Sequence, residues 1–123
     1  MDEEKLNQIS ERIIGCAFKV SNVLGCGFLE KVYENALAHE LRKSGLKVEQ
    51  QHSVSVYYDG IVVGDFYADL LVEGTILVEL KAVTEFCNDH TAQCLNYLTA
   101  TGNPLCLLLN FGKPRVQIKR FRS

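Results

Sequence analysis

The sequence lacks tryptophan, has one methionine and two prolines, and contains no apolar run longer than the five residues Leu105–Leu109. Because a membrane-spanning helix needs roughly 20 apolar residues, we expect no membrane segment. Pro104 and Pro114 lie near expected element boundaries, and internal repeats and Ser/Gly-rich linkers are absent. With 123 residues, of which 47% are hydrophobic, the sequence predicts a single domain over residues 1–123 with a real core.

The cysteines do not form the pattern of a disulfide framework. Their number is odd and no C-x-x-C motif occurs; the five are Cys16, Cys26, Cys87, Cys94 and Cys106. This usage predicts reduced thiols that lie mostly in the core. The N-terminus is acidic, whereas a signal peptide begins with a basic segment. We therefore expect a cytoplasmic protein.

The net charge of −2 does not indicate a generally basic surface for nucleic acid. The basic residues are nevertheless concentrated in a tail that holds no acid, at Lys113, Arg115, Lys119, Arg120 and Arg122. Two interpretations of this basic tail stay open: an edge that faces phosphates, or a solvated terminal strand.

Apolar residues recur every three or four positions in the first part of the chain, which is the period of an amphipathic helix. This spacing predicts a helix over residues 3–24 and a second from about Leu29 to Lys43, ended near Gly45. The inward side of the second helix is expected to consist of Leu29, Val32, Ala36, Leu37 and Leu41.

From Leu46 onward the period changes to two, which is typical of strands. Asp59-Gly60 and Glu73-Gly74 predict two tight turns. The first turn precedes a predicted strand over about 61–72, and the second joins it to one over about 75–83. Further on, the pattern predicts a helix over 85–100, a buried central strand over 105–111 and a strand over 115–121. The order α-α-β-β-β-α-β-β predicts an α/β or α+β fold with a mixed central sheet flanked by helices.

Charged residues interrupt the two strands around Glu73-Gly74. Alternation predicts opposite faces for two sets of side chains, Asp65, Tyr67 and Asp69 against Phe66, Ala68 and Leu70. If these strands are antiparallel neighbours, Asp69 and Glu79 can lie side by side, with Lys81 one pleat further. Carboxylates in such a place suit Mg²⁺ or Mn²⁺. An ion pair on a solvent-facing sheet is the alternative interpretation of the same spacing.

Three short motifs then resemble a known family. Asp69, nine intervening residues and Glu79-Leu80-Lys81 resemble the D…(D/E)-x-K core of the PD-(D/E)XK nuclease superfamily. The segment GFLEKVY at residues 27–33 is similar to the motif of the GxxExxY family within that superfamily. Gln93 and Tyr97 are similar to the Q-x-x-x-Y motif of its exonuclease-like branch. The resemblance extends from residue 13 to residue 121 and implies a restriction-endonuclease-like core.

The resemblance also implies roles for the matched residues. The implied ligands of Mg²⁺ or Mn²⁺ are Glu30, Asp69, Glu79 and the backbone carbonyl of Leu80. Lys81 would orient or activate the attacking water, and Gln93 and Tyr97 would position the lysine or the phosphate. Such groups suit phosphodiester hydrolysis, since a cation offsets the charge that develops in an in-line displacement.

Two positions depart from the family pattern. Ala68 stands where the motif has proline, and Tyr67 stands where a basic residue is expected, which puts a phosphate contact there in doubt. Glu34, four residues after Glu30, shares its helix face; it is either a second acid near the metal or, more often in such a pattern, a solvated carboxylate. We expect Tyr33 to be a packing aromatic with a hydrogen-bonded hydroxyl.

The third predicted helix contributes candidate substrate contacts. His90, Gln93 and Tyr97 fall within an arc of about 60° on this helix, as a wall of an active site requires. His90 is a candidate phosphate contact or a capping residue. Lys113 and Arg115 of the basic tail are further candidate substrate contacts. A zinc site at Cys87, His90 and Cys94 is disfavoured because it lacks a comparable fourth ligand.

Three hypotheses about function follow. The leading one is a Mg²⁺-dependent nuclease that acts on nucleic acid, with DNA as the expected substrate. The second is a catalytically silent nuclease-like module that binds nucleic acid or a protein partner, and a homodimer or partner chain would supply specificity. The third interprets the charged residues as structural ion pairs in a protein that contributes only a surface to an assembly.

Overall fold

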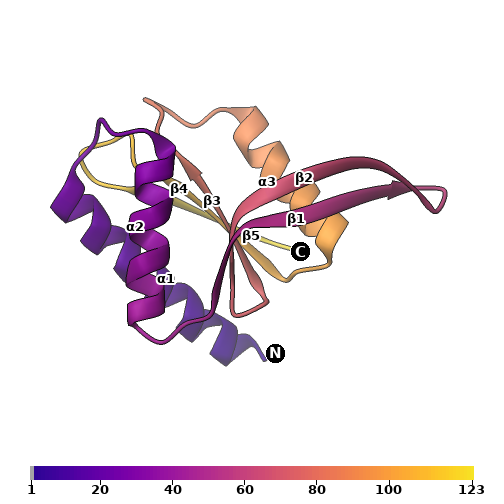
Figure 1. Cartoon of the computed structure of the whole chain (residues 1–123), viewed down its shortest axis with the longest axis horizontal. Coiled ribbons are helices and arrows are strands. Elements are labelled where there is room, and N and C mark those ends of the chain that lie inside the picture. Colours follow the sequence, from indigo (N-terminus) through magenta and orange to yellow (C-terminus); the bar gives the residue numbers. More distant parts are fainter. Residues whose placement is uncertain (1) are drawn as a thin grey trace.

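The structure, a computed structural model, describes residues 2–123. Its elements are, in order, α1 (Glu3–Leu24), α2 (Glu30–Lys43), β1 (Val48–Tyr58), β2 (Ile61–Val72), β3 (Ile76–Lys81), α3 (Asn88–Thr101), β4 (Leu105–Asn110) and β5 (Gln117–Arg122). This order confirms the predicted one (Figure 1). Across residues 2–123, no helix combines the length and apolar character that crossing a membrane requires.

The five strands form one mixed sheet in the order β1-β2-β3-β4-β5. Neighbouring strands are antiparallel except β3 and β4, which run parallel and are joined through α3. Both predicted turns are confirmed: Asp59 and Gly60 have φ of 54° and 76°, and Glu73 and Gly74 have φ of 52° and 67°. Positive φ at both central residues gives the twist that two-residue hairpins need.

Helices cover both faces of the sheet. α1 and α2 pack on one face, where their apolar side chains join those of β3 and β4 in the larger core cluster. α3 packs on the opposite face over a smaller cluster that includes Cys94, Tyr97 and Leu108. All six residues of β4 are buried, which confirms the predicted central strand between two helical layers.

The predicted inward side of α2 is confirmed at Leu37 and Leu41 but is wrong at the start of the helix. Leu29 and Val32 are 80% and 39% exposed, whereas Tyr33, Leu37 and Leu41 are fully buried. The Tyr33 ring stacks on Phe111, with ring centroids 4.8 Å apart. Because an aromatic side chain buries a large area, this contact turns the helix so that Tyr33 rather than Val32 faces the sheet.

Strict alternation along β2 is also wrong at one point. Ala68 belongs to the cluster under α3, whereas Leu70 belongs to the cluster under α1 and α2. The backbone pairing of β2 with β3 extends only from Val72 to Leu70, so the twisting strand leaves its neighbour at Asp69.

The expectation of mostly buried thiols holds for only part of the set. Cys94 and Cys106 are buried, Cys16 is intermediate, and Cys26 and Cys87 are exposed. The two exposed cysteines precede α2 and α3, where the chain runs over the surface.

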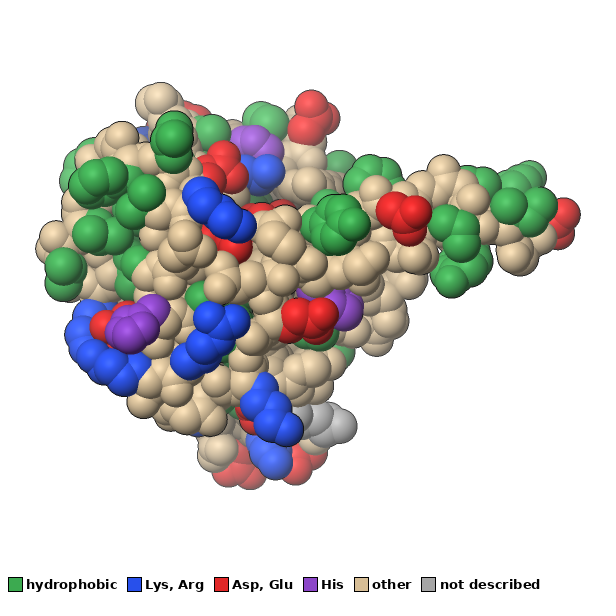
Figure 2. Space-filling view, viewed as in Figure 1, with side chains coloured by type: hydrophobic (Ala, Val, Ile, Leu, Met, Phe, Trp, Pro, Cys, Tyr) green, Lys and Arg blue, Asp and Glu red, His purple; other side chains and the backbone are tan. Residues whose placement is uncertain are grey.

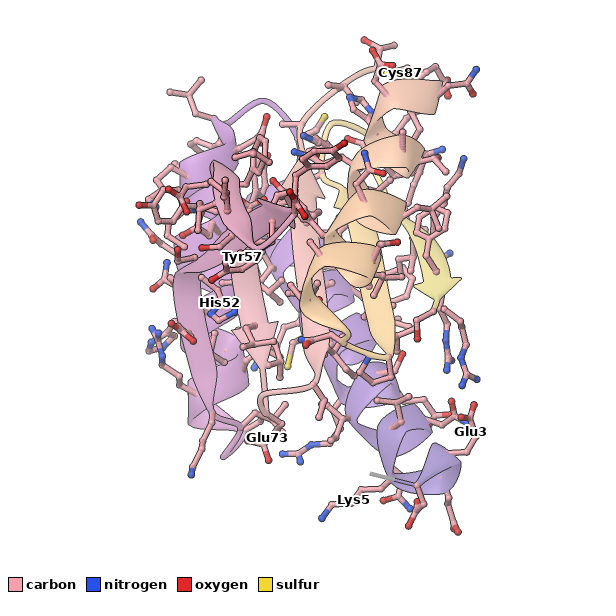
Figure 3. All side chains as sticks on the ribbon, turned by 90° about the vertical axis from the view of Figure 1, so that its right-hand side faces the viewer. Glu3, Lys5, His52, Tyr57, Glu73 and Cys87 are labelled. Atoms are coloured by element: carbon pink, nitrogen blue, oxygen red, sulfur yellow. The ribbon has the colours of Figure 1, made fainter. Side chains whose placement is uncertain are left out.

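The ends of β1 and β2 around Asp59-Gly60 project from the body as a hairpin arm, residues 53–67 (Figures 1 and 2). Its large exposed apolar side chains are Tyr57, Tyr58, Ile61, Val62, Val63, Phe66 and Tyr67. α3 runs alongside the strands that lead into the arm, as the turned view in Figure 3 shows. The arm contains no Lys or Arg.

Candidate active site

Asp69 and Glu79 lie side by side where β2 and β3 separate. The backbone N–H of Asp69 donates to Glu79 Oε1 at 3.1 Å, and the backbone N–H of Leu80 donates to Asp69 Oδ2 at 2.8 Å. Each carboxylate thus replaces the strand-to-strand pairing that ends at Leu70 and Val78. The predicted antiparallel pair and the predicted adjacency of the two acids are present.

Burial makes this pair of acids electrostatically costly. Glu79 is 2% exposed. Its pKa is raised to about 9, first by burial and then by the Asp69 charge. Burial also raises the pKa of Asp69, and the Glu34 charge adds to the effect, whereas the hydrogen bond from Leu80 N–H opposes it. Two acids in such a place favour a bound proton or a bound cation.

Glu30 faces the same site from the first residue of α2. Burial raises its pKa, the Lys81 charge lowers it and the Asp69 charge raises it. Among the charged residues, Lys81 and Asp69 act most strongly on Glu30. Lys81 forms no ion pair with any acid within residues 2–123. The alternative of a simple Lys81 ion pair on an open sheet face is therefore not what the structure contains.

The segment before α2 is fixed by Tyr33 and Gly27. The Tyr33 hydroxyl donates to the carbonyl of Gly25 at 2.6 Å and accepts from the backbone N–H of Phe28 at 3.2 Å. Gly27 has a φ of 116°, a backbone conformation that residues other than glycine rarely adopt. The expected packing role of Tyr33 is confirmed, and the glycine and tyrosine of this motif together set where Glu30 begins the helix.

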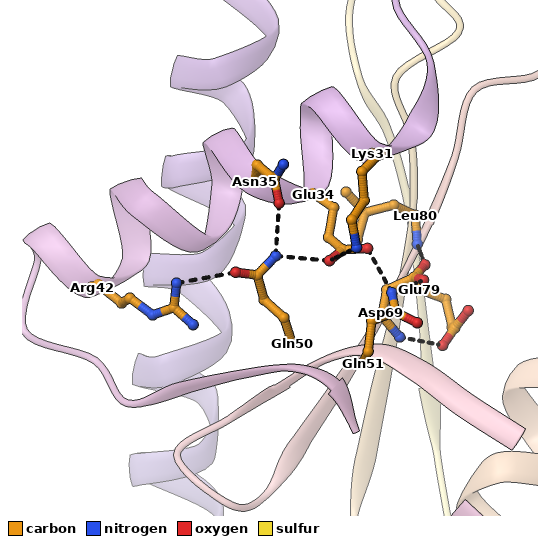
Figure 4. Close-up of polar contacts among 9 residues, drawn as sticks. All are labelled: Lys31, Glu34, Asn35, Arg42, Gln50, Gln51, Asp69, Glu79 and Leu80. Atoms are coloured by element: carbon orange, nitrogen blue, oxygen red, sulfur yellow. Dashed lines mark hydrogen bonds and ion pairs between the residues drawn. The ribbon is translucent and has the colours of Figure 1, made fainter. Parts of the chain in front are cut away.

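Glu34 is not solvated, contrary to the favoured expectation. It is 4% exposed and accepts hydrogen bonds from Lys31 Nζ (3.0 Å), Gln50 Nε2 (2.7 Å) and Gln51 Nε2 (2.7 Å), as Figure 4 shows. Its neighbour on the helix, Tyr33, points into the core, so the same turn of α2 carries Glu34 inward. Spacing from Glu30 alone gave no sign of these partners.

Gln51 is a site residue that sequence reasoning missed. It lies opposite Asp69, between the pairs Gln50–Leu70 and His52–Ala68, and its φ is 54°. Its amide donates to Glu34 Oε1 at 2.7 Å and contacts Asp69 Oδ1 at 3.4 Å. A positive φ in a non-glycine residue is uncommon and concentrates at functional sites.

Asn110 was missed as well, although it is the one polar residue in a run of apolar ones. It is fully buried and holds the segment that follows Lys81: its Oδ1 accepts from Val83 N–H at 3.0 Å and its Nδ2 donates to Val83 O at 2.9 Å. Gly112 permits the approach, because a Cβ there would lie 2.3 Å from the Val83 carbonyl oxygen. These contacts hold Val83, two residues after Lys81, against the end of β4.

α3 forms the other wall of the site. Gln93 Nε2 donates to the Tyr97 hydroxyl at 3.2 Å. Burial raises the pKa of Tyr97, and the Glu79 charge adds to this effect. His90 Nδ1 accepts from the backbone N–H of Cys87 at 3.2 Å and so caps the helix. The His90 charge also lowers the pKa of Glu30.

The basic tail contacts the chain itself. Lys113 Nζ pairs with Glu85 at 2.5 Å, and the Arg115 guanidinium lies over the Phe18 ring at 4.9 Å. Further along, Arg120 contacts Asn7 and Arg122 pairs with Glu3. These contacts lie apart from Asp69 and Glu79, so the structure does not bring the tail into the group formed by the acids and Lys81.

The donor set fits a hard divalent cation in its chemistry. Within residues 2–123, no three acidic, histidine or cysteine side chains stand close enough to hold a metal ion as they are oriented. Asp69 and Glu79 each direct one oxygen to a backbone N–H. The pKa values of Glu30, Asp69 and Glu79 are all raised by burial, and Lys81 is the cation that opposes each shift. Carboxylate oxygens short of positive charge are what Mg²⁺ and Mn²⁺ bind.

Comparisons with known proteins identify the family and the fold. Residues 7–121 match the family model described as the PD-(D/E)XK nuclease superfamily. A search of curated proteins finds no match. Two solved structures are similar in fold: an alkaline exonuclease from Laribacter hongkongensis (TM-score 0.53, 14% identity) and the same enzyme in complex with dAMP (TM-score 0.53, 13% identity). Each alignment covers 93% of this chain and 82% of the other.

The mixed α+β sheet flanked by helices is therefore a restriction-endonuclease-like fold, as the sequence predicts. The match over residues 7–121 includes all three motifs, from the Glu30 segment to Tyr97. This chain belongs to the PD-(D/E)XK nuclease superfamily.

Proposed function

We propose that this protein is a divalent-metal-dependent nuclease that hydrolyses phosphodiester bonds of nucleic acid, with DNA as the expected substrate. We further propose that it is a single domain of the GxxExxY family. The observation that carries the proposal is the meeting of Asp69 and Glu79 at the separation of β2 and β3, with Lys81 unpaired beside them. The superfamily match and the fold shared with an exonuclease support it.

The proposed metal ligands are the carboxylates of Glu30, Asp69 and Glu79 and the backbone carbonyl of Leu80. A divalent ion, when bound there, polarises a phosphoryl oxygen and lowers the pKa of a water molecule. The ligands come from α2, β2 and β3, so their approach is set by the fold rather than by one flexible loop.

The other residues act on the substrate directly. Lys81 orients the attacking water and offsets the negative charge that grows on the phosphate during displacement. Gln93 and Tyr97, which are already hydrogen-bonded to each other, position the phosphate against the lysine. His90 contacts the phosphate at the rim, and Lys113 and Arg115 contact the strand further away. Gln51 and Glu34 hold Asp69 in place from β1 and α2.

We expect cleavage of labelled nucleic acid in Mg²⁺ or Mn²⁺ and loss of that cleavage in excess chelator. Single-stranded, duplex and branched DNA, and RNA of the same sequences, are incubated with the protein and separated on denaturing gels. Restoring the divalent ion restores the products, because the chelator removes only the ion. Persistent cleavage in chelator, or none with any substrate, contradicts the proposal.

One observation favours a second candidate, a silent module that binds nucleic acid or a protein partner. As oriented, the acids do not gather into a ready-made group of three ligands within residues 2–123. Salt-dependent binding of nucleic acid that requires Arg115 and its basic neighbours, without any cleavage, is the result that this alternative predicts.

A homodimer or a partner protein is the proposed source of additional specificity. The proposed location is the cytoplasm, where free thiols such as the exposed Cys26 and Cys87 persist.

A further inference from the structure

A groove separates the hairpin arm from α3, beside the candidate active site. Its volume is about 710 Å³, within the range of roughly 300–1,000 Å³ that is typical of small-ligand sites. Its lining includes aromatic rings and amides: Tyr57 and Phe66 come from the arm, and Gln93, Asn96 and Tyr97 come from α3. Figure 3 shows how α3 runs beside the strand that carries Tyr57.

The groove shares Gln93 and Tyr97 with the α3 wall of the candidate active site. These two side chains are hydrogen-bonded to each other at 3.2 Å. The Phe66 ring lies 6.3 Å from the Tyr97 ring, centroid to centroid. A molecule in the groove would therefore contact the same two side chains that position the phosphate in the proposed function.

The lining chemistry distinguishes between parts of a nucleotide. No Lys or Arg lines the groove, and Asp89 is its one charged residue. A phosphate would gain no charge partner there and would be repelled by Asp89. A nucleobase is uncharged and flat, stacks on aromatic rings, and forms paired hydrogen bonds with Asn and Gln amides.

The exposed aromatic side chains of the arm also favour a nucleobase over a phosphate. Phe66 is 49% exposed, and Tyr57 is 65% exposed, although both rings are large and apolar. Exposed aromatic side chains of this kind, next to a site for a nucleic-acid backbone, are typical of platforms on which unpaired bases stack.

We propose that the groove binds an unpaired nucleobase of the substrate strand, so that the substrate is single-stranded beside the phosphate that is cleaved. This inference rests on the proposed function, because it takes the acids and Lys81 as the place of the scissile phosphate. Phe66 and Tyr57 stack on the base, and Asn96 recognises its edge.

The test compares Phe66→Ala with the wild-type protein in binding two strands without divalent ions. One is a single-stranded deoxyoligonucleotide of about 12 nucleotides, a length within the site sizes of single-strand binders. The other is a strand of equal length and charge in which every nucleotide is abasic. Because Phe66 offers one stacking surface for a base, Phe66→Ala is expected to weaken binding of the normal strand about 10-fold and to leave abasic binding unchanged.

Two further variants sharpen this experiment. Asn96→Ala, on the exposed side of α3, is expected to weaken binding of the normal strand alone, and it leaves the arm intact. Tyr58→Ala, at the end of β1 and outside the groove lining, is expected to change neither affinity. Equal losses on both strands, or no loss on the normal strand in either groove variant, overturn the proposal.

Sedimentation of the same proteins tests whether a second copy of this chain occupies the groove instead. A wild-type dimer that Phe66→Ala converts to monomer, without any base-dependent change in strand binding, overturns the proposal in favour of that occupant. Cleavage in Mg²⁺ without base-dependent binding overturns the groove inference alone. Base-dependent binding without cleavage overturns the proposed hydrolysis alone.

Discussion

Lys81→Ala is expected to lower the rate of nucleic-acid cleavage by about 10²–10³-fold or more, which is the usual cost of losing one charge-stabilising group in an active site. Lys81 ends β3 beside three acids, and no acid within residues 2–123 pairs with it. Its role in the proposed reaction is to offset the charge that appears on the phosphate. Its loss should therefore lower the rate constant of the cleavage step, measured under single-turnover conditions in Mg²⁺.

The fold should survive this substitution. The backbone of residue 81 is held by a hydrogen bond from Phe111 N–H to the Lys81 carbonyl at 2.8 Å and by the Asn110 contacts to Val83. We expect a cooperative unfolding transition within a few degrees of that of the wild type. Lys43→Ala, on the exposed end of α2, is the matched control and should cleave normally. Equal activity of Lys81→Ala and wild type contradicts the assignment.

Glu79→Gln is expected to stabilise the metal-free protein at pH 8 by about 2 kcal/mol, which corresponds to a Tm rise of about 8 °C in a domain of this size. The carboxyl of Glu79 is 2% exposed and its pKa is raised to about 9. Above the unfolded pKa of about 4.3, the folded state must keep a proton on Glu79 or bear a buried charge next to Asp69. The neutral amide removes this cost.

The sign of the pH dependence follows from the same pKa. Because the folded pKa of Glu79 exceeds the unfolded one, the folded state binds more protons between pH of about 4.5 and about 9. The contribution of Glu79 to the free energy of unfolding is fully present below that window and declines as pH rises through it. Chemical denaturation at pH 5, 6.5 and 8 should show this decline in wild type and a flatter profile in Glu79→Gln.

Glu85→Gln provides the control, since Glu85 is an exposed acid outside the group of Asp69 and Glu79. It should leave the pH profile close to that of wild type. Mg²⁺ should recover part of the lost stability of the wild type at pH 8 and should do so far less in Glu79→Gln. A Glu79→Gln protein that is less stable than wild type at pH 8 would contradict the destabilising effect assigned to the Glu79 charge.

The periodic parts of the fold could be predicted from the sequence because burial imposes the period. α1 has the limits that its apolar pattern predicts, and β4 is buried as predicted and ends one residue before the predicted end. Both positive-φ turns follow from Asp59-Gly60 and Glu73-Gly74. The adjacency of Asp69 and Glu79 could be predicted because the short turn at Glu73-Gly74 fixes an antiparallel register.

The remaining features depend on contacts that no local pattern encodes. α2 is turned by the stacking of Tyr33 on Phe111, a residue far along the chain. Glu34 is buried because Gln50 and Gln51 of β1 reach it, and the φ of 54° at Gln51 arises where β2 departs from β3. A sequence pattern predicts that polar residues such as these lie on the surface. Their burial is possible only because hydrogen-bond partners from distant segments offset the cost of desolvation.

The proposed metal site joins acids from α2, β2 and β3, and calorimetric titration with Mn²⁺ measures binding there without any substrate. Wild type should bind Mn²⁺, and Glu30→Gln should weaken this binding at least 10-fold, a loss of about 1.4 kcal/mol. Glu40→Gln, on the same helix as Glu30, should bind as wild type does. Wild-type binding that Glu30→Gln leaves unchanged, or no binding by the wild type at millimolar Mn²⁺, would contradict the proposed metal site.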